Sequence, residues 1–439
     1  MVNILHISAH MGGGVGKFLS QTTSYEKRNN SIYTHKILLL EQPQKLQFID
    51  VCNESGVIVE VVESYTQIEK EMLEADIVIL HWWHNPTMCR LLANFPALKI
   101  RLIIWVHISG CNYPALTEEF AMIPNRLFFT SPYSYENPLW TKKAYEKILG
   151  KSKVIYGLGV ENLAIKAVNE NINSDKFTIT YIGTLDESKI HPNFIKFCKE
   201  VIKRVPCARF VMLGDLSENN NLFEQAKIEG IESCFDFIGY TRDVDKYLQE
   251  SDAFGYPLNP YHFGTTENSI MEAMAFGIPV VMLDQCTEKY IVQNGYDGLL
   301  AQNEEDYAKC IQLLYENPKE RSRLGKNAQN TILEKFSMKS NVSRMHNQFE
   351  LILKENPKIF QFASTIGEVP IQWFLEGLGK DRVLFENVLA DKENKKLLDK
   401  VKECEPILRG KSKSSAIHFA EVYPEEKELQ FLKNILANG

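Results

Sequence analysis

The greatest density of chemically capable residues lies between Ser251 and Asp284. This stretch reads SDAFGYPLNPYHFGTTENSIMEAMAFGIPVVMLD and holds two glutamates, Glu267 and Glu272. Ser269 and Glu272 have the spacing of a capping box, in which a serine and a glutamate three residues later satisfy the first N–H groups of a helix. Because the free N–H groups at a helix start bind anions, the pattern predicts an anion site at this point of the chain.

The neighbouring elements place that site at the edge of a sheet. We expect a strand over Ala253–Tyr256, a loop over Pro257–Gly264, a short helix over Ile270–Phe276 and a strand over Pro279–Leu283. Gly277 stands where a helix ends on a left-handed residue. A helix that follows a parallel strand begins at the carboxyl edge of the sheet, where open α/β sheets bind ligands.

The same alternation of apolar strands and polar helices extends through two α/β halves, which favours parallel sheets built from βαβ units. In the first half the expected strands are Asn3–Ser8, His35–Leu40, Val57–Val62, Ile77–His81, Arg101–His107, Leu127–Thr130 and Lys153–Tyr156. In the second half they are Thr178–Ile182, Arg209–Leu213, Phe235–Ile238, Ala253–Tyr256 and Pro279–Leu283, with helices at Asn193–Val205 and Ser217–Glu229.

Breaks in this alternation predict the domain boundaries. A polar, Asn-rich stretch near 169–176 separates a first Rossmann-like domain over 1–168 from a second over 169–340. Residues 341–439 are expected to form a return helix and a mostly helical C-terminal extension. Packing of this extension onto the main body is expected at its apolar positions, Phe360, Phe362, Trp373, Phe374 and Leu375.

Composition narrows the class of protein. The chain of 439 residues exceeds one ordinary core, and its net charge of −7 argues against nucleic acid as a partner. Nine cysteines without a CxxC pair indicate reduced thiols and a cytoplasmic protein. The first residues do not resemble a signal peptide, and no apolar run reaches about 18 residues. Peripheral contact with the inner face of a membrane and the oligomeric state stay open.

The run Glu272–Val281, EAMAFGIPVV, resembles the donor-binding signature of the family-4 retaining glycosyltransferases with the GT-B fold. The resemblance implies two Rossmann-like, doubly wound domains that face a cleft, the first on the acceptor side and the second on the nucleotide-sugar side. It also implies that Glu272 holds ribose hydroxyls of the donor. From the residues alone, a glutamate that only caps its helix is the alternative.

The loop before this helix departs from the family's pattern. The family's first glutamate stands with seven residues between it and the second, and Gly264 occupies that position here. Glu267 stands closer, with four residues between it and Glu272. We expect Glu267 to act at the donor sugar or diphosphate, with a solvated loop carboxylate as the alternative. Three neighbours share the expected donor contact: Thr266, Asn268 and Ser269.

A second landmark concerns the charge that neutralises the donor diphosphate. The family has an arginine and a lysine after a strand and a glycine, and here Tyr181–Leu185 reads YIGTL before Lys189. Lys189 matches the lysine and is expected to act at the diphosphate during catalysis. Thr184 replaces the arginine, so one cation of the family's clamp is missing. A solvated lysine is the alternative.

A glycine cluster follows the first strand. The residues GGGVGK before Phe18 fail the Walker A pattern, because Met11 replaces its first glycine and Phe18 replaces its hydroxyl residue. The resemblance implies instead that the loop lies against the donor phosphates and sugar, and a tight turn without a ligand is the alternative. The glycines expected at the donor are Gly13, Gly14 and Gly16.

Histidines stand at the ends of two predicted strands. The family often has a histidine beside the donor sugar at the position of His107, where it can donate a hydrogen bond or share a proton with the acceptor. His81 and His84 are expected to line the acceptor side. Trp82 and Trp83 between them are expected either to stack on a sugar or to pack in the core. No metal site is expected, because no carboxylate or cysteine adjoins the two histidines at ligand spacing.

Three further landmarks follow the family's order. Ser131 follows a predicted strand, and Gly157–Glu161 resembles the glycine–valine–aspartate turn that ends the first domain. Gly239 and Tyr240 fit the loop on which the nucleotide base rests. The resemblance extends from residue 3 to about residue 300.

The expected reaction is transfer of a sugar from a nucleotide-sugar donor, with UDP as the family's habit, to a glycan, lipid-linked or protein acceptor. The resemblance implies retention of the anomeric configuration. Fixed positive charge and helix N–H groups at the leaving diphosphate lower the barrier without a metal ion, and no cofactor is implied. Two other classes stay open: a nucleotide-sugar-binding partner without activity, and a nucleotide-sugar epimerase, which forms product without an acceptor.

Overall fold

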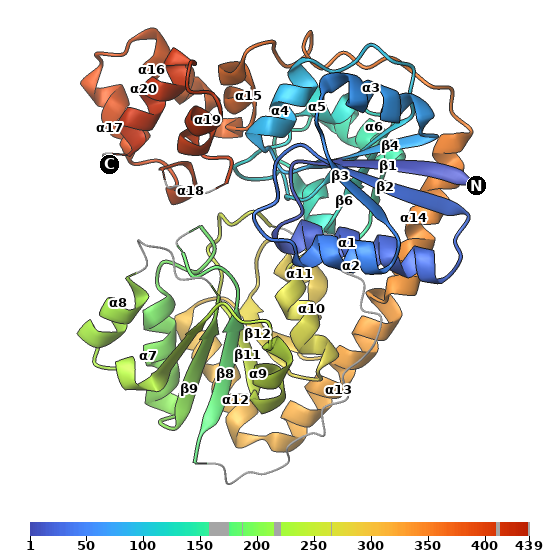
Figure 1. Cartoon of the computed structure of the whole chain (residues 1–439). Coiled ribbons are helices and arrows are strands. Elements are labelled where there is room, and N and C mark those ends of the chain that lie inside the picture. Colours follow the sequence, from blue (N-terminus) through green and yellow to red (C-terminus); the bar gives the residue numbers. More distant parts are fainter. Residues whose placement is uncertain (158–174, 187, 215–220, 265, 410–412, 438–439) are drawn as a thin grey trace. The chain divides into compact units, whose positions relative to one another are not determined.

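The computed structural model describes residues 1–157, 175–186, 188–214, 221–264, 266–409 and 413–437. The chain divides into two compact units (Figure 1). The first consists of Met1–Gly159, Phe263–Thr265 and Asn341–Gly439, and the second consists of Val160–His262 and Thr266–Ser340. Among the described residues no helix combines the length and the apolar character that a membrane span needs.

The first unit is built on a seven-stranded sheet in which every neighbouring pair of strands is parallel. The strand order is β3-β2-β1-β4-β5-β6-β7. Strands β2 and β3 are added on one side of β1, and β4 to β7 are added on the other side, as in a doubly wound fold. The strands are β1 (Val2–Ser8), β2 (Tyr33–Leu39), β3 (Ile58–Val61), β4 (Ile77–Trp82), β5 (Leu102–Val106), β6 (Arg126–Phe129) and β7 (Ser152–Val154). Each falls on an apolar run that predicted a strand.

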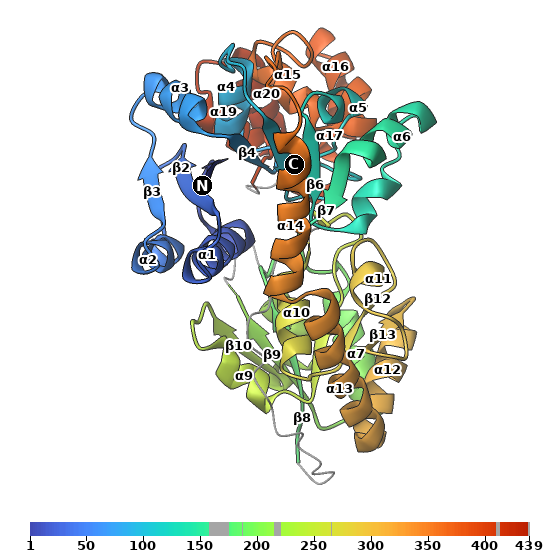
Figure 2. The same ribbon diagram turned by 90° about the vertical axis from the view of Figure 1, so that its right-hand side faces the viewer.

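Helices cover both faces of this sheet. On one face α1 (Gly13–Arg28) and α14 (Met338–Leu353) bury Phe18, Met345 and Phe349 against the strands, and Figure 2 shows α14 running beside β6 and β7. The remaining helices of the N-terminal part are α2 (Gln47–Glu54), α3 (Tyr65–Glu74), α4 (Pro86–Ala93), α5 (Glu118–Met122), the 3₁₀ turn η1 (Pro132–Glu136) and α6 (Lys142–Lys151).

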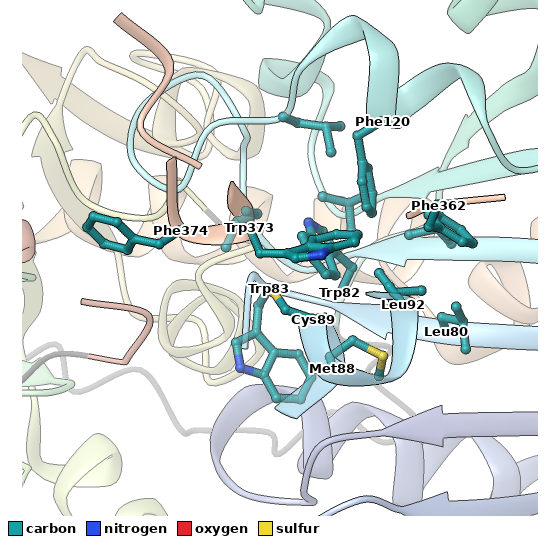
Figure 3. Packing of buried hydrophobic residues seen from close by; sticks show 14 of the residues in the cluster. Leu80, Trp82, Trp83, Met88, Cys89, Leu92, Phe120, Phe362, Trp373 and Phe374 are labelled. Carbon is teal, nitrogen blue, oxygen red and sulfur yellow. The ribbon is translucent and has the colours of Figure 1, made fainter. Parts of the chain in front are cut away.

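The C-terminal segment packs onto this unit through its aromatic residues. Trp373 lies 6.3 Å from Trp82, ring centroid to ring centroid, and shares a buried cluster with Phe362, Phe374 and Phe120 (Figure 3). The predicted packing of the extension onto the main body is thus confirmed. The helices of this segment are α15 (Pro370–Glu376), η3 (Gly379–Asp381), α16 (Arg382–Ala390), α17 (Lys395–Lys402), α18 (Pro406–Arg409), α19 (Ala416–Val422) and α20 (Lys427–Leu436).

The second unit has a six-stranded parallel sheet of order β10-β9-β8-β11-β12-β13. Its strands are β8 (Phe177–Ile182), β9 (Ala208–Leu213), β10 (Phe235–Gly239), β11 (Ala253–Tyr256), β12 (Val280–Leu283) and β13 (Gly298–Ala301). Its helices are α7 (Phe194–Arg204), α8 (Leu222–Ile228), η2 (Glu232–Cys234), α9 (Val244–Glu250), α10 (Asn268–Ala275), α11 (Glu288–Ile291), α12 (Glu304–Glu316) and α13 (Pro318–Lys335). The sequence analysis missed β13, because its four residues, GLLA, form too short a run to stand out.

Two Rossmann-like parallel sheets with helices on their faces make the predicted α/β architecture. The predicted turn Gly157–Glu161 falls mostly outside the described residues, as does the start of the predicted helix Ser217–Glu229. The latter is seen as α8 from Leu222 onward.

Candidate functional site

The predicted donor residues of the second unit gather at the carboxyl edge of its sheet. Thr184 follows β8, Gly239 ends β10, and Glu267 lies between β11 and α10. Because all six strands are parallel, these points lie at one edge. Thr184 and Tyr240 are exposed there, and Gly239 has a φ of 78° that favours glycine.

Helix α10 starts two residues earlier than the capping box predicts. It begins at Asn268, and its N-cap residue is Glu267, which has a φ of 54° in the left-handed region and makes no side-chain cap. Ser269 therefore lies inside the first turn, and the predicted Ser269–Glu272 capping box is wrong. The predicted C-terminus is confirmed, since Gly277 follows the helix with a φ of 71°.

Glu267 is a buried carboxylate rather than a solvated one, with 3% of its surface exposed. It forms an ion pair with Lys189, whose side chain is 18% exposed, and accepts a hydrogen bond from the Tyr256 hydroxyl at 3.3 Å. Lys189 is carried to this point by backbone pairing, because the Asn259 N–H donates to its carbonyl at 2.9 Å. The structure thus brings together two of the three predicted catalytic residues.

A histidine that the sequence analysis did not single out completes this cluster. His262 Nδ1 lies 3.5 Å from Glu267 Oε1, and its Nε2 lies 3.2 Å from Glu288 Oε1. Burial opposes a charge on this ring, but Glu288 and Glu267 outweigh burial and raise the pKa of His262 to about 10. Two cations therefore face two carboxylates, and the cluster of Lys189, His262, Glu267 and Glu288 is balanced in charge.

The spacing of residues could not reveal His262 and Glu288 as partners. They are 26 residues apart, one in an irregular loop and the other at the start of the short helix α11. Only the aligned strand ends bring them together. The local signal was a histidine in a loop already expected to bind a ligand, PYHFG.

Gly264 explains why the family's first glutamate is absent from its usual position. Its φ is 62°, and a Cβ atom there would stand 2.8 Å from the Ser109 Cβ atom of the same unit. A glutamate does not fit this backbone without displacing Ser109. The carboxylate of this loop is Glu267, three residues later.

The glycine cluster of the first unit opens α1. Gly12 is the N-cap residue, and Gly13 has a φ of 59°. A Cβ atom on Gly16 would stand 2.3 Å from the Met11 carbonyl oxygen, so close packing alone requires this glycine. Gly14 is exposed in the first turn. The expected donor contacts of Gly13, Gly14 and Gly16 stay predictions.

His107, the third predicted catalytic residue, follows β5 at the carboxyl edge of the first sheet and is 6% exposed. It begins a row of hydrogen-bonded rings that crosses the sheet, which we call the imidazole chain. Its nitrogen pairs are His107 Nε2 with His81 Nδ1 at 2.8 Å, His81 Nε2 with His6 Nδ1 at 3.0 Å, and His6 Nε2 with His35 Nδ1 at 2.8 Å.

A carboxylate stands at the far end of the imidazole chain. His35 Nε2 lies 3.3 Å from Glu26 Oε1, and His346 Nε2 lies 2.7 Å from Glu26 Oε2. Although burial raises the pKa of Glu26, bonds from His346 and His35 outweigh it and lower the pKa to about 2. Burial lowers the pKa of His107 to about 3 and places those of His81 and His6 well below the ordinary value.

Two expectations for the acceptor side, those for His81 and His84, are wrong. His81 has no exposed surface because it belongs to the imidazole chain. His84 is also buried, with its Nε2 at 2.8 Å from the Trp373 carbonyl oxygen. Of the two alternatives for the tryptophans, Trp82 takes the second, since it is buried and stacks on Phe120 in the core. No group of three His, Cys, Asp or Glu side chains within the described part of the chain is arranged to hold a metal ion.

Residues 165–331 match the model of a family described as glycosyl transferases group 1. One curated relative is an uncharacterised glycosyltransferase of Haemophilus influenzae, 26% identical over 50% of this chain and 62% of the relative. Another is the N,N'-diacetylbacillosaminyl-diphospho-undecaprenol alpha-1,3-N-acetylgalactosaminyltransferase of Campylobacter jejuni, 29% identical over 42% of this chain and 47% of the relative. The chain thus spans less than two thirds of either relative.

The fold is shared with a solved structure of the same architecture. The crystal structure of HepE from Anabaena, in complex with UDP and glucose, has a TM-score of 0.63 at 15% identity and covers 80% of this chain and 100% of its own. At this identity the likeness establishes the fold alone.

Proposed function

This chain belongs to the glycosyltransferases of GT-B fold, with a group 1 domain in its second unit, and on that premise we propose that it transfers a sugar from a nucleotide-sugar donor to a hydroxyl acceptor. The observation that carries the proposal is the buried cluster of Lys189, Glu267, His262 and Glu288 at the carboxyl edge of the second sheet. The proposal extends to retention of configuration and to catalysis without a metal ion.

The left-handed Glu267 supports a ligand role for this cluster. A non-glycine residue in this region costs on the order of 1 kcal/mol or more, and such residues concentrate at functional sites. The ion pair with Lys189 and the contact with His262 hold Glu267 in this conformation. We propose that its carboxylate contacts hydroxyls of the donor sugar, as the family's first glutamate does.

Lys189 has donors left for a diphosphate. An ammonium group has three N–H donors, and the pair with Glu267 uses one of them. The negative charge on the leaving diphosphate grows as the sugar–phosphate bond breaks, so a fixed cation there stabilises the transition state more than the ground state. We propose that the N–H groups of Asn268 and Ser269, at the start of α10, also stabilise this negative charge.

The remaining donor contacts and the substrates follow from the resemblance and the relatives. We propose that Glu272, in the middle of α10 and partly buried, holds the ribose hydroxyls, and that Tyr240 lies beside the base. The UDP bound by HepE favours a uridine nucleotide. The name of the Campylobacter jejuni relative favours a lipid-linked diphosphate or a glycan as acceptor.

A two-step experiment tests the proposal. Thermal shift of the full chain against UDP-glucose, UDP-galactose and their N-acetylated forms, with GDP- and ADP-sugars as controls, identifies the donor, since a ligand of the native state raises its stability. Mass spectrometry then follows the sugar in the presence of lipid-linked and glycan acceptors. Transfer supports the proposal. Binding without UDP release identifies a non-catalytic partner, and a changed sugar without an acceptor identifies an epimerase.

A further inference from the structure

The hydrogen bonds of the imidazole chain run in one direction. Each neutral imidazole has one N–H donor and one bare acceptor nitrogen. In the imidazole chain every ring from His107 to His6 directs its Nε2 at the Nδ1 of the next ring. Only two tautomeric states satisfy all three contacts: every ring protonated on Nε2, or every ring protonated on Nδ1.

Glu26 decides between these two states. A carboxylate is an acceptor only, and His35 Nε2 lies 3.3 Å from Glu26 Oε1, within ion-pair distance but outside hydrogen-bond geometry. A bare Nε2 lone pair facing a buried carboxylate is repulsive, so a neutral His35 carries its proton on Nε2 and accepts on Nδ1. His6 must then donate through Nε2, and the same choice passes to His81 and on to His107.

We propose that the carboxylate of Glu26, acting through the imidazole chain, fixes His107 as the Nε2–H tautomer and so presents an unprotonated Nδ1 at the carboxyl edge of the first sheet. His107 then accepts a hydrogen bond from a substrate hydroxyl through Nδ1 and does not donate one. His35, His6 and His81 are positioning residues for this contact. The substrate part of the inference rests on the proposed transfer reaction, whereas the tautomer does not.

Burial lowers the pKa values of His6, His81 and His107 and keeps these three rings in the neutral state that this logic needs. His6 and His81 are 0–1% exposed, and Trp105 stacks beside both His81 and His107. Besides its own members, the ionisable groups that face the chain are Glu26 on α1 and, behind it, His346 on α14. Neighbouring imidazoles in the row disfavour each other's protonation. Glu26 contacts His35, so three rings separate its carboxylate from His107.

Nitrogen NMR of the full chain, labelled with ¹⁵N-histidine, reads the tautomer directly. The chain has ten histidines, and the signals lost in a His107→Gln variant identify His107. The wild type should show His107 as a single Nε2–H tautomer at pH 8.5, where a free imidazole is neutral. In Glu26→Gln the amide can donate as well as accept, so His107 should populate both tautomers. Glu26→Asp, which keeps the charge, should restore the single form.

Three results overturn the inference: a protonated Nδ1 in wild-type His107, a mixed state in the wild type, or an unchanged tautomer in folded Glu26→Gln. Where Glu26→Gln fails to fold by circular dichroism, His35→Gln interrupts the same chain and takes its place, with the same criteria. His346→Gln is the matched control, because it removes the other partner of Glu26 but leaves the carboxylate, and its His107 tautomer should stay single.

Kinetics provide the second readout. With a donor found by thermal shift, Glu26→Gln should lower kcat about tenfold or more while the donor KM changes less than about twofold, because a misprotonated ring loses a contact without losing the site. Glu54→Gln, an exposed glutamate on α2, should change neither. An unchanged kcat in Glu26→Gln would show that the proposed hydrogen bond between His107 Nδ1 and a substrate hydroxyl is wrong. If wild-type protein turns over no nucleotide sugar, the transfer reaction fails while the NMR result still stands.

Discussion

The two sheets of this protein bury histidine in opposite protonation states. At the edge of the first sheet, His107, His81 and His6 are neutral, with pKa values lowered by burial. At the edge of the second sheet, His262 is just as buried, yet its pKa is raised to about 10. The difference lies in the neighbours, since His262 touches two carboxylates and the whole imidazole chain touches one. Desolvation sets the default state of a buried imidazole, and nearby charge reverses it.

Acid should therefore destabilise the first unit most. His6, His81 and His107 are neutral when folded but bind protons below about pH 6.5 when unfolded. The unfolded state then holds more protons, and the free energy of unfolding falls by about 1.4 kcal/mol per pH unit for each such histidine as the pH drops from 6.5 toward 3. Hydrogen exchange of peptides from β1, β4 and β5 at several pH values measures this. Protection that is constant from pH 7 to pH 4.5, after correction for intrinsic rates, contradicts it.

The second unit should show the opposite dependence on pH at its donor edge. The raised pKa of His262 contributes stability that is complete below about pH 6.5 and is lost as the pH rises through about 10. Replacing it by the neutral His262→Gln leaves Glu267 and Glu288 buried without a cation from this side, which should cost about 3–5 kcal/mol. Urea unfolding followed at peptides of β11 and α10 measures the loss. His191→Gln, a half-buried histidine of the same unit, is the control, and equal losses in both variants reject the ionic account.

Loss of Lys189 should affect turnover more than folding. Lys189→Ala should lower kcat/KM about a hundredfold or more, the scale for deleting one preorganised stabiliser of a leaving group. Lys196→Ala removes an exposed lysine from α7 and should have no effect. Thr184→Arg restores the family's second cation and should recover part of the rate lost in Lys189→Ala. Near wild-type turnover in Lys189→Ala means that other groups, such as Lys17 or Arg242, hold the diphosphate.

Glu272 should affect donor affinity alone. Because α10 has no side-chain cap, Glu272→Ala removes no capping box, and loss of a ribose contact should raise the donor Kd about tenfold. Calorimetric titration with the donor measures this, with Glu250→Ala, an exposed glutamate that ends α9, as the matched control. An unchanged Kd in folded Glu272→Ala assigns the ribose to another residue.

The sequence predicted the fold better than it predicted the polar contacts. Apolar runs such as those of β4 and β5 are long and continuous, so they indicate buried strands without further information. The start of α10 was misplaced because the capping pattern assumes an extended N-cap residue, whereas Glu267 is left-handed and held by tertiary contacts. No local pattern announces such a conformation.

Side chains that contact each other across a sheet were the contacts that the sequence predicted least well. His6, His35, His81 and His107 follow no sequence period, and their rings meet because neighbouring strands align at a particular register. In that register His6 faces Ile37 of β2 and Ile79 of β4. The spacing of residues in the sequence is a weak predictor of the order of strands in a sheet, and it does not predict their register. His107 and Lys189 were found from the resemblance, whereas Glu26 at the end of the imidazole chain and His262 beside Glu267 became apparent only in the structure.

The central claim is that this chain cleaves a nucleotide sugar with its own charges and no metal ion. The most direct measurement is the rate of UDP formation from the donor identified by thermal shift, with and without excess EDTA, in wild-type protein and in Lys189→Ala. The account predicts an unchanged wild-type rate in EDTA and about a hundredfold lower rate in Lys189→Ala. Loss of UDP formation in EDTA, with recovery on addition of Mg²⁺ or Mn²⁺, would contradict it.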